Sequence, residues 1–337
     1  KMMAIAPMSV PMMDSYHLPK EERDKFEHFN DNPIKQVASD PVSTFSLDVD
    51  TGSYALVRQF IQQGRLPASD AVRVEELINY FSYQYPKATG QHPFASETEL
   101  STAPWQPEHY LLRIGVQAQD VHVSAMPPAN LVFLVDVSGS MDEPNKLPLV
   151  ISSLQMLTQQ LRPQDKVSLV VYAGRTEVVL EPTAGNKKAD IQAALGRLQA
   201  GGSTAGASAL DLAYKMARKG YVANGINRIL LATDGDFNVG VTDTHQIKDM
   251  VKRERESGIT LSTLGFGQGN FNDAMMEQIA DVGNGNYSYI DSLNEARKVL
   301  VDELSSTFNT VAKDVKVQIE FNPNVVAEYR LIGYENR

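Results

Sequence analysis

The sequence contains no cysteine, which excludes disulfide bonds and thiolate metal ligands. Long apolar runs are also missing, and segments such as 131–135 and 229–232 have only the length of a buried strand. A membrane-spanning helix needs about 20 apolar residues, so none is expected. Positive charge is in deficit, with 31 Lys and Arg against 41 Asp and Glu. This balance argues against nucleic-acid or anionic-lipid binding and fits a protein that attracts cations.

The composition is otherwise that of a globular protein, with 42% hydrophobic residues. The 337 residues are enough for two folded units of about 100–200 residues each. The chain begins Lys1-Met2-Met3 without a secretory hydrophobic segment, and a processed terminus would look the same. The first 40 residues place methionines among prolines without helical or strand periodicity, so we expect residues 1–40 to be a flexible N-terminal segment.

From residue 129 to residue 310, apolar strands alternate with amphipathic helices. The predicted strands are 131–135, 167–172, 177–180, 228–232, 260–264 and 286–290, and the predicted helices are 146–161, 189–198, 207–219, 245–255, 272–280 and 293–308. This alternation is typical of an α/β domain with a doubly wound, mostly parallel sheet covered on both faces. Ligand sites in such sheets lie at the carboxyl ends of the strands.

The segments on either side, residues 41–128 and 311–337, have the alternating pattern of half-buried strands. The predicted strands are 45–49, 110–117, 315–321 and 325–331, the predicted helices are 53–63 and 70–81, and residues 83–105 are expected to be an ordered loop. The last two strands are expected to pair with each other across Asn322-Pro323-Asn324. We also expect the C-terminal strands to pair with the N-terminal region, so that the flanks form a second, small β-rich unit.

Oxygen-bearing side chains follow two strands of the α/β domain and one loop between them. The residues concerned are Asp136, Ser138, Ser140, Thr204 and Asp234. The first three are spaced two residues apart after the first strand, Thr204 lies in a Gly-rich loop that opens a helix, and Asp234 follows the fourth strand. Two carboxylates and three hydroxyls form an all-oxygen set of the kind that Mg²⁺ or Mn²⁺ prefers, with Ca²⁺ as a further candidate.

The Asp136-x-Ser138-x-Ser140 spacing, followed by Thr204 and Asp234, resembles the metal-ion-dependent adhesion site (MIDAS) of von Willebrand factor type A domains. The resemblance covers residues 130–308. It implies a cation close to the three hydroxyls, with the two carboxylates acting directly or through water. It also implies one coordination position left for an Asp or Glu carboxylate of a protein partner. Neutral hydroxyl ligands would leave the cation's charge under-compensated, so an incoming carboxylate would be held strongly.

The flanks narrow the resemblance. Segments 43–51, 75–81 and 333–336 resemble a bacterial subfamily, the YfbK-type proteins. Its members are often exported or lipid-anchored, which implies the cell envelope or periplasm, with membrane contact only through a lipid anchor absent from this chain. They usually continue past this tail into another domain, so a fragment is expected. In related domains the final helix, here 293–308, moves when the metal site engages its ligand, which suggests a relay to the β-rich unit.

Three functions compete for the predicted site. The first is a divalent-cation-dependent protein-binding module that is not an enzyme. The second is a metal-dependent hydrolase, which needs a general base near the cation, and the sequence places neither a His nor a Lys there. The third is a structural module in which the cation only orders loops. The six histidines lack ligand spacing, and loop 201–206 lacks the Gly-Lys-Ser/Thr of a phosphate-binding loop.

Overall fold

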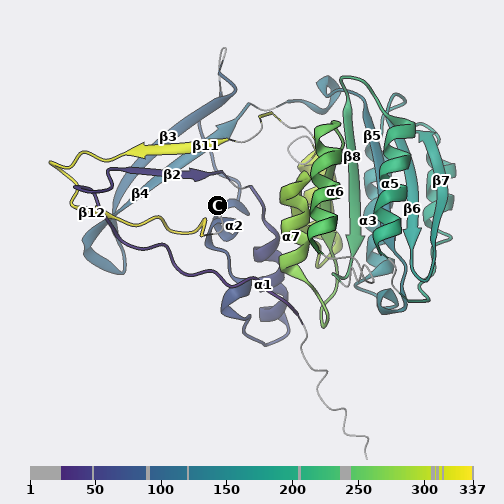
Figure 1. Ribbon diagram of the computed structural model, residues 1–337, viewed down its shortest axis with the longest axis horizontal. Coiled ribbons are helices and arrows are strands. Elements are labelled where there is room, and N and C mark those ends of the chain that lie inside the picture. The colour runs from purple at the N-terminus through teal and green to yellow at the C-terminus, as the bar shows by residue number, and fades with distance from the viewer. Residues whose placement is uncertain are drawn as a thin grey trace, which may run out of the picture.

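The computed structural model describes residues 24–47, 49–88, 92–119, 121–203, 206–235, 244–304, 308, 311–312 and 315–335. An α/β domain lies beside a smaller β-rich unit, to which both ends of the described chain contribute (Figure 1). The predicted fold class is confirmed, because the α/β domain holds a six-stranded, mostly parallel sheet between helices. None of the helices in the described ranges is both long enough and apolar enough to cross a membrane.

The large sheet consists of β5 (Ala129–Asp136), β6 (Lys166–Tyr172), β7 (Thr176–Ala184), β8 (Ile226–Thr233), β9 (Thr260–Gly265) and β10 (Asn284–Tyr289). Their order across the sheet is β10-β9-β8-β5-β6-β7, and only the edge strand β7 runs antiparallel to its neighbour. The strand order reverses between β5 and β8, which lie side by side. Such a reversal is the topological switch point at which doubly wound sheets bind ligands.

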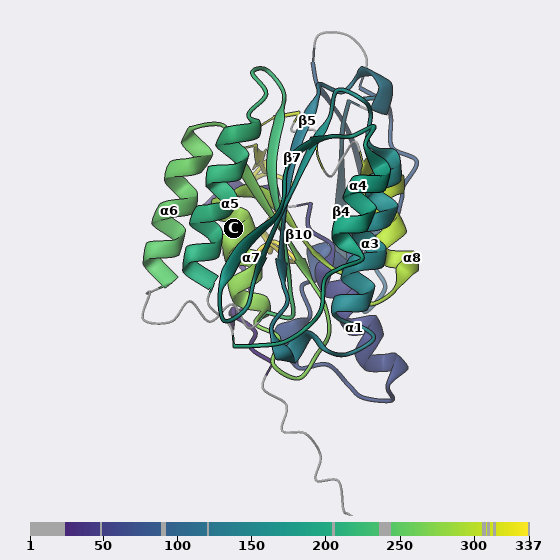
Figure 2. The same cartoon turned by 90° about the vertical axis from the view of Figure 1, so that its right-hand side faces the viewer.

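Helices cover both faces of this sheet, with α5 and α6 on one side and α3 and α4 on the other (Figure 2). The helices of the domain are α3 (Leu147–Gln160), α4 (Lys188–Leu195), α5 (Gly206–Gly220), α6 (Thr244–Glu256), α7 (Asp273–Val282) and α8 (Leu293–Arg297). Strand β5 is buried along its whole length because it supplies both cores: Phe133 packs on the α3 side and Leu134 on the α5 side. The predicted helix 293–308 differs, since after Arg297 the chain continues as a π-helical turn, Lys298–Asp302.

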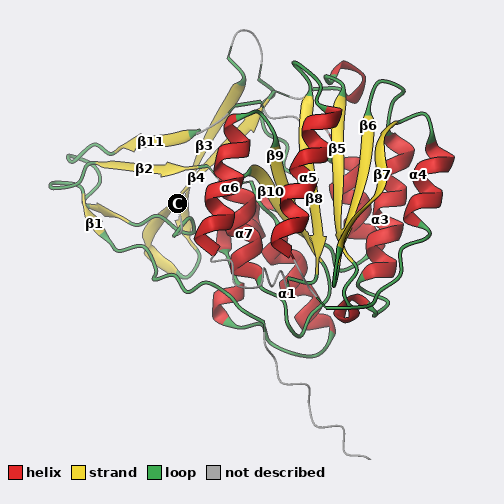
Figure 3. Ribbon diagram, turned by 45° about the vertical axis from the view of Figure 1, so that its right-hand side comes forward, coloured by secondary structure: helices red, strands yellow, loops and turns green. Residues whose placement is uncertain are grey.

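In the described part of the chain, the β-rich unit is built from two-stranded antiparallel sheets that lie apart from the large sheet (Figure 3). The pairs are β2 (Val42–Ser46) with β11 (Lys316–Glu320), β1 (Lys35–Gln36) with β12 (Glu328–Tyr329), and β3 (Phe94–Ala103) with β4 (Gln106–Ala118), all antiparallel. Both C-terminal strands therefore pair with the N-terminal flank. The prediction that they pair with each other is wrong, because β2 offers β11 five consecutive partners, whereas β12 has only two residues.

The expected loop over residues 83–105 is also wrong, because β3 occupies Phe94–Ala103 and pairs with β4 along its whole length. Both faces of this hairpin are largely exposed, so it lacks the apolar alternation by which a half-buried strand is recognised. The helix predicted at 70–81 is shorter: a 3₁₀ turn at Ser69–Ala71 precedes α2 (Val74–Asn79). The helix predicted at 53–63 is α1 (Gly52–Gln62).

The start of the described N-terminal segment docks on the α/β domain through Asp24 and Lys25. The Asp24 carboxylate accepts hydrogen bonds from the backbone nitrogens of Gly269 and Phe271, at 2.9 and 2.8 Å. Lys25 forms a parallel bridge with Asn272. These contacts hold the start of the segment against the loop that joins β9 to α7. Residues 1–23 lie outside the described part of the chain.

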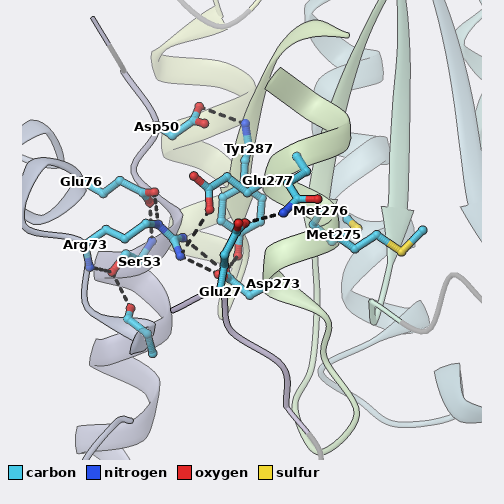
Figure 4. Close-up of polar contacts among 12 residues, drawn as sticks. Glu27, Asp50, Ser53, Arg73, Glu76, Asp273, Met275, Met276, Glu277 and Tyr287 are labelled. Atoms are coloured by element: carbon cyan, nitrogen blue, oxygen red, sulfur yellow. Dashed lines mark hydrogen bonds and ion pairs between the residues drawn. The ribbon is translucent and has the colours of Figure 1, made fainter. Parts of the chain in front are cut away.

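A buried ion network joins the N-terminal flank to α7 and β10 (Figure 4). The guanidinium of Arg73, a residue only 6% exposed, donates hydrogen bonds to Glu76 and to both carboxylate oxygens of Asp273. The Glu277 carboxylate lies 3.6 Å away, and the Tyr287 hydroxyl donates to Asp273. Burial opposes the charged form, but these carboxylates raise the pKa of Arg73 well above its ordinary value. The flank is therefore joined to the α/β domain by interactions that are costly to break.

Candidate metal centre

The predicted residues of the first metal loop lie at the switch point of the sheet. Asp136 is the last residue of β5 and is fully buried. One of its carboxylate oxygens accepts a hydrogen bond from the backbone N–H of Ser138 at 2.8 Å, and the other accepts one from the Thr233 hydroxyl at 3.0 Å. The Ser138 and Ser140 hydroxyl oxygens are 3.1 Å apart. Tight pairing of β5 with β8 thus fixes the carboxylate, and the following turn brings both serines together.

Asp234 directly follows β8 and is fully buried beside the first loop. The next residue, Gly235, has a φ of 87°, and a Cβ there would lie 2.3 Å from the backbone nitrogen of Asn272. Only glycine permits this close turn. Burial raises the pKa of Asp136 to about 6; hydrogen bonds from Ser138 and Thr233 oppose the rise, and the charge of Asp234 adds to it. The negative charges of the two buried carboxylates therefore repel each other.

Thr204, the fifth predicted ligand, lies outside the described residues, but the chain leading to it is placed beside the first loop. The carbonyl oxygen of Gly202 accepts a hydrogen bond from the Gly139 N–H at 3.0 Å, and the Gly201 N–H donates to the Val137 carbonyl at 2.8 Å. Four of the five predicted residues thus lie at one edge of the sheet. The contribution of Thr204 stays a prediction.

A lysine that the sequence analysis missed lies inside this site. Lys146, 3% exposed, donates hydrogen bonds from Nζ to an Asp234 carboxylate oxygen and to the Ser140 carbonyl, both at 3.0 Å. The expectation that neither a His nor a Lys lies near the metal is therefore wrong for Lys. The sequence held one signal, since Lys146 comes six residues after Ser140 and directly precedes α3. A residue at the start of that helix must lie close to the metal loop.

The donor set fits a hard cation. In an octahedral shell with Mg–O bonds of about 2.0–2.1 Å, neighbouring ligand oxygens lie about 2.9 Å apart, whereas Ca–O bonds of about 2.3–2.6 Å separate them by about 3.3–3.7 Å. The Ser138 and Ser140 hydroxyls are 3.1 Å apart and hydrogen-bonded to each other, a distance that lies midway between the two values and therefore does not select one cation. Within the described ranges no three His, Cys, Asp or Glu side chains lie together as a metal cluster.

Comparison with known proteins agrees with this fold. Residues 130–303 match the family model "von Willebrand factor type A domain", which covers more than half of the 337 residues. The chain belongs to the von Willebrand factor type A domain family. Residues 20–113 match the model "von Willebrand factor", and residues 306–337 match "Uncharacterized protein YfbK, C-terminal". These flanks make it a YfbK-type protein, 54% identical to YfbK of Escherichia coli (strain K12) over 328 residues, and the predicted resemblance is confirmed.

That match covers 95% of this chain and 57% of YfbK. The protein sll0103 of Synechocystis sp. is 34% identical over 185 residues, which covers 55% of this chain and 43% of that protein. The chain therefore spans about half the length of these curated relatives. Among solved structures, the von Willebrand factor type A protein of Catenulispora acidiphila is 20% identical with a TM-score of 0.49, covering 67% of this chain and 52% of the other. BatB of Bacteroides thetaiotaomicron is 21% identical with a TM-score of 0.46, covering 53% and 98%.

Proposed function

We propose that this protein is a divalent-cation-dependent protein-binding module that captures an Asp or Glu carboxylate of a partner protein. The observation that carries the proposal is the buried Asp136 and Asp234 pair at the switch point, beside hydroxyls of Ser138 and Ser140 that are 3.1 Å apart. When bound, the cation, Mg²⁺ or alternatively Mn²⁺ or Ca²⁺, supplies an open coordination position for the partner's carboxylate. Family membership supports this reading over a catalytic one.

The residues of the chain divide this task between them. Ser138, Ser140 and Thr204 would hold the cation with neutral hydroxyls, and Asp136 and Asp234 would hold it directly or through water. Asp136 also orients the first loop, because its carboxylate accepts the Ser138 N–H. The three hydroxyl donors are neutral, so they add no negative charge that would repel an acidic partner.

A cavity of about 460 Å³ beside the first loop offers room for a partner's side chains. It lies between the end of β6 and Gly201-Gly202, and Val137, Ala173 and Arg175 contribute to its lining. The Arg175 side chain is 86% exposed and pairs with Glu177 at 3.2 Å. An exposed guanidinium next to the metal loop favours a partner with acidic residues.

The test is calorimetric titration of the metal-free protein with Mg²⁺, Mn²⁺ and Ca²⁺, beside Asp136→Ala. We expect saturable binding that the variant loses, because the carboxylate that fixes the loop is gone. Asp142→Ala is the matched control, since Asp142 is exposed, lies two residues after Ser140 and carries the same charge. Undiminished binding in Asp136→Ala would rule out the assigned site.

The other two functions predict different outcomes in the same variants. A hydrolase would turn over phosphate or peptide substrates and lose turnover in Asp136→Ala. A purely structural module would show a cation-dependent rise in melting temperature without any partner. Metal-dependent capture of a partner, lost on chelation and in Asp136→Ala, would support the binding module. Export to the cell envelope or periplasm stays a prediction.

A further inference from the structure

We infer that Lys146 makes cation binding depend on the acidic partner: its buried charge weakens binding of the cation alone and strengthens binding of cation and carboxylate together. The inference rests on the proposed function. It starts from an ammonium group that contacts two predicted ligand residues at once, the carboxylate of Asp234 and the carbonyl of Ser140, at 3.0 Å each. At 3% exposure, water does little to screen this charge.

The surroundings of Lys146 hold the ammonium in place. Gly267, with a φ of 73°, lies directly against the lysine stem, and a Cβ there would come within 2.4 Å of Lys146 Cε. The Lys146 backbone is fixed as well, since its N–H donates to the Glu143 carbonyl and its carbonyl accepts the Val150 N–H. Gly267 leaves room for the aliphatic part of Lys146, and two oxygen atoms accept hydrogen bonds from its ammonium group. The surroundings are therefore shaped for a charged side chain at this position.

Charge balance at the site explains the consequence. Two ionised carboxylates and one ammonium leave one excess negative charge, a divalent cation turns this into one excess positive charge, and a partner carboxylate restores neutrality. Without the ammonium, the cation alone would neutralise the two carboxylates. A buried net charge is unfavourable. With Lys146 present, the site is neutral only when it holds both the cation and the partner's carboxylate; without Lys146, it is neutral with the cation alone.

The experiment measures Mn²⁺ affinity by electron paramagnetic resonance of the free ion in wild type, Lys146→Met, Lys146→Gln and Lys146→Arg. We expect the two neutral variants to bind Mn²⁺ at least tenfold more tightly than wild type. Lys146→Arg, which keeps the charge, should stay within a few-fold of wild type. Sodium acetate serves as the carboxylate probe, with sodium chloride of equal ionic strength as the control. Acetate should raise the affinity of wild type for Mn²⁺ more than that of Lys146→Met.

The outcomes separate this inference from the proposed function. Equal or weaker Mn²⁺ affinity in both neutral variants would overturn the role of Lys146 while leaving the metal site intact. No saturable binding in any of the four proteins would overturn the proposed function, and the inference with it. Thermal unfolding shows that each variant is folded; a lysine needed only for structure would give weaker binding in the neutral variants and the same acetate effect in all.

Discussion

At the scale of single residues, the protonation of Asp136 affects both the stability of the fold and the binding of a cation. Burial raises the pKa of Asp136 to about 6, from an ordinary value of 3.8. Proton binding thus favours the folded metal-free protein. This stabilisation is complete below about pH 4 and is lost as pH rises through about 6, where the buried carboxylate becomes ionised. A cation needs the ionised form, so protons compete with it on the acidic side of that range.

We therefore predict that Mg²⁺ raises the melting temperature more at pH 7.5 than at pH 5. The apparent affinity should fall by up to about tenfold for each pH unit below about 6, because one proton must leave Asp136. Thermal unfolding and calorimetry over this pH range check both statements. Asp136→Asn is the control and should show no Mg²⁺ response at either pH. A Mg²⁺ response of the wild type that does not change with pH would show that Asp136 is not a ligand.

At the scale of elements, the sequence predicted the buried strands and helices of the α/β domain within a few residues, except for the last helix, because apolar periodicity is a local property. Strand β5 is an example, since its apolar residues pack on both faces of the sheet. The β3–β4 hairpin was missed because it buries little, and the pairing of β11 was wrong because strand partners far apart in sequence leave no local signal. The position of Lys146 near the metal loop had a local signal, but its pairing with Asp234, 88 residues away, had none.

The contact between Arg73, which directly precedes α2, and Asp273 of α7 gives an element-scale prediction. Replacing Arg73 by Met leaves Glu76 and Asp273 buried without their counterion, and breaking such a buried pair costs about 3–5 kcal/mol. Urea unfolding should show this loss. Arg113→Met is the matched control, because Arg113 pairs with Glu99 on the exposed hairpin, and its unfolding midpoint should stay unchanged. Equal midpoints for both variants would mean that the buried network adds nothing to stability.

At the scale of the whole molecule, contacts connect the N-terminal flank to the metal site by a route other than the last helix. The Tyr289 hydroxyl on β10 lies within hydrogen-bond distance of Gln59 on α1 and of the Gly267 carbonyl. Gly267 in turn packs against the stem of Lys146, which binds Asp234. The same loop is held by Asp24 of the N-terminal segment. Contacts of the flank thus restrain the loop around Gly267, which packs against Lys146.

This route predicts that Tyr289→Phe alters cation affinity although Tyr289 contacts none of the four placed metal residues. Losing the bond to Gly267 should loosen the lysine and tighten Mn²⁺ binding by about 2–30-fold, which corresponds to the coupling energies that such mutations change. In a Lys146→Met background the effect should vanish, because the intermediary is gone. Tyr221→Phe is the control, since Tyr221 is exposed and its hydroxyl donates a long hydrogen bond to the Ser257 carbonyl, at 3.5 Å. A Tyr289→Phe effect that persists without Lys146 would require another connection between flank and cation.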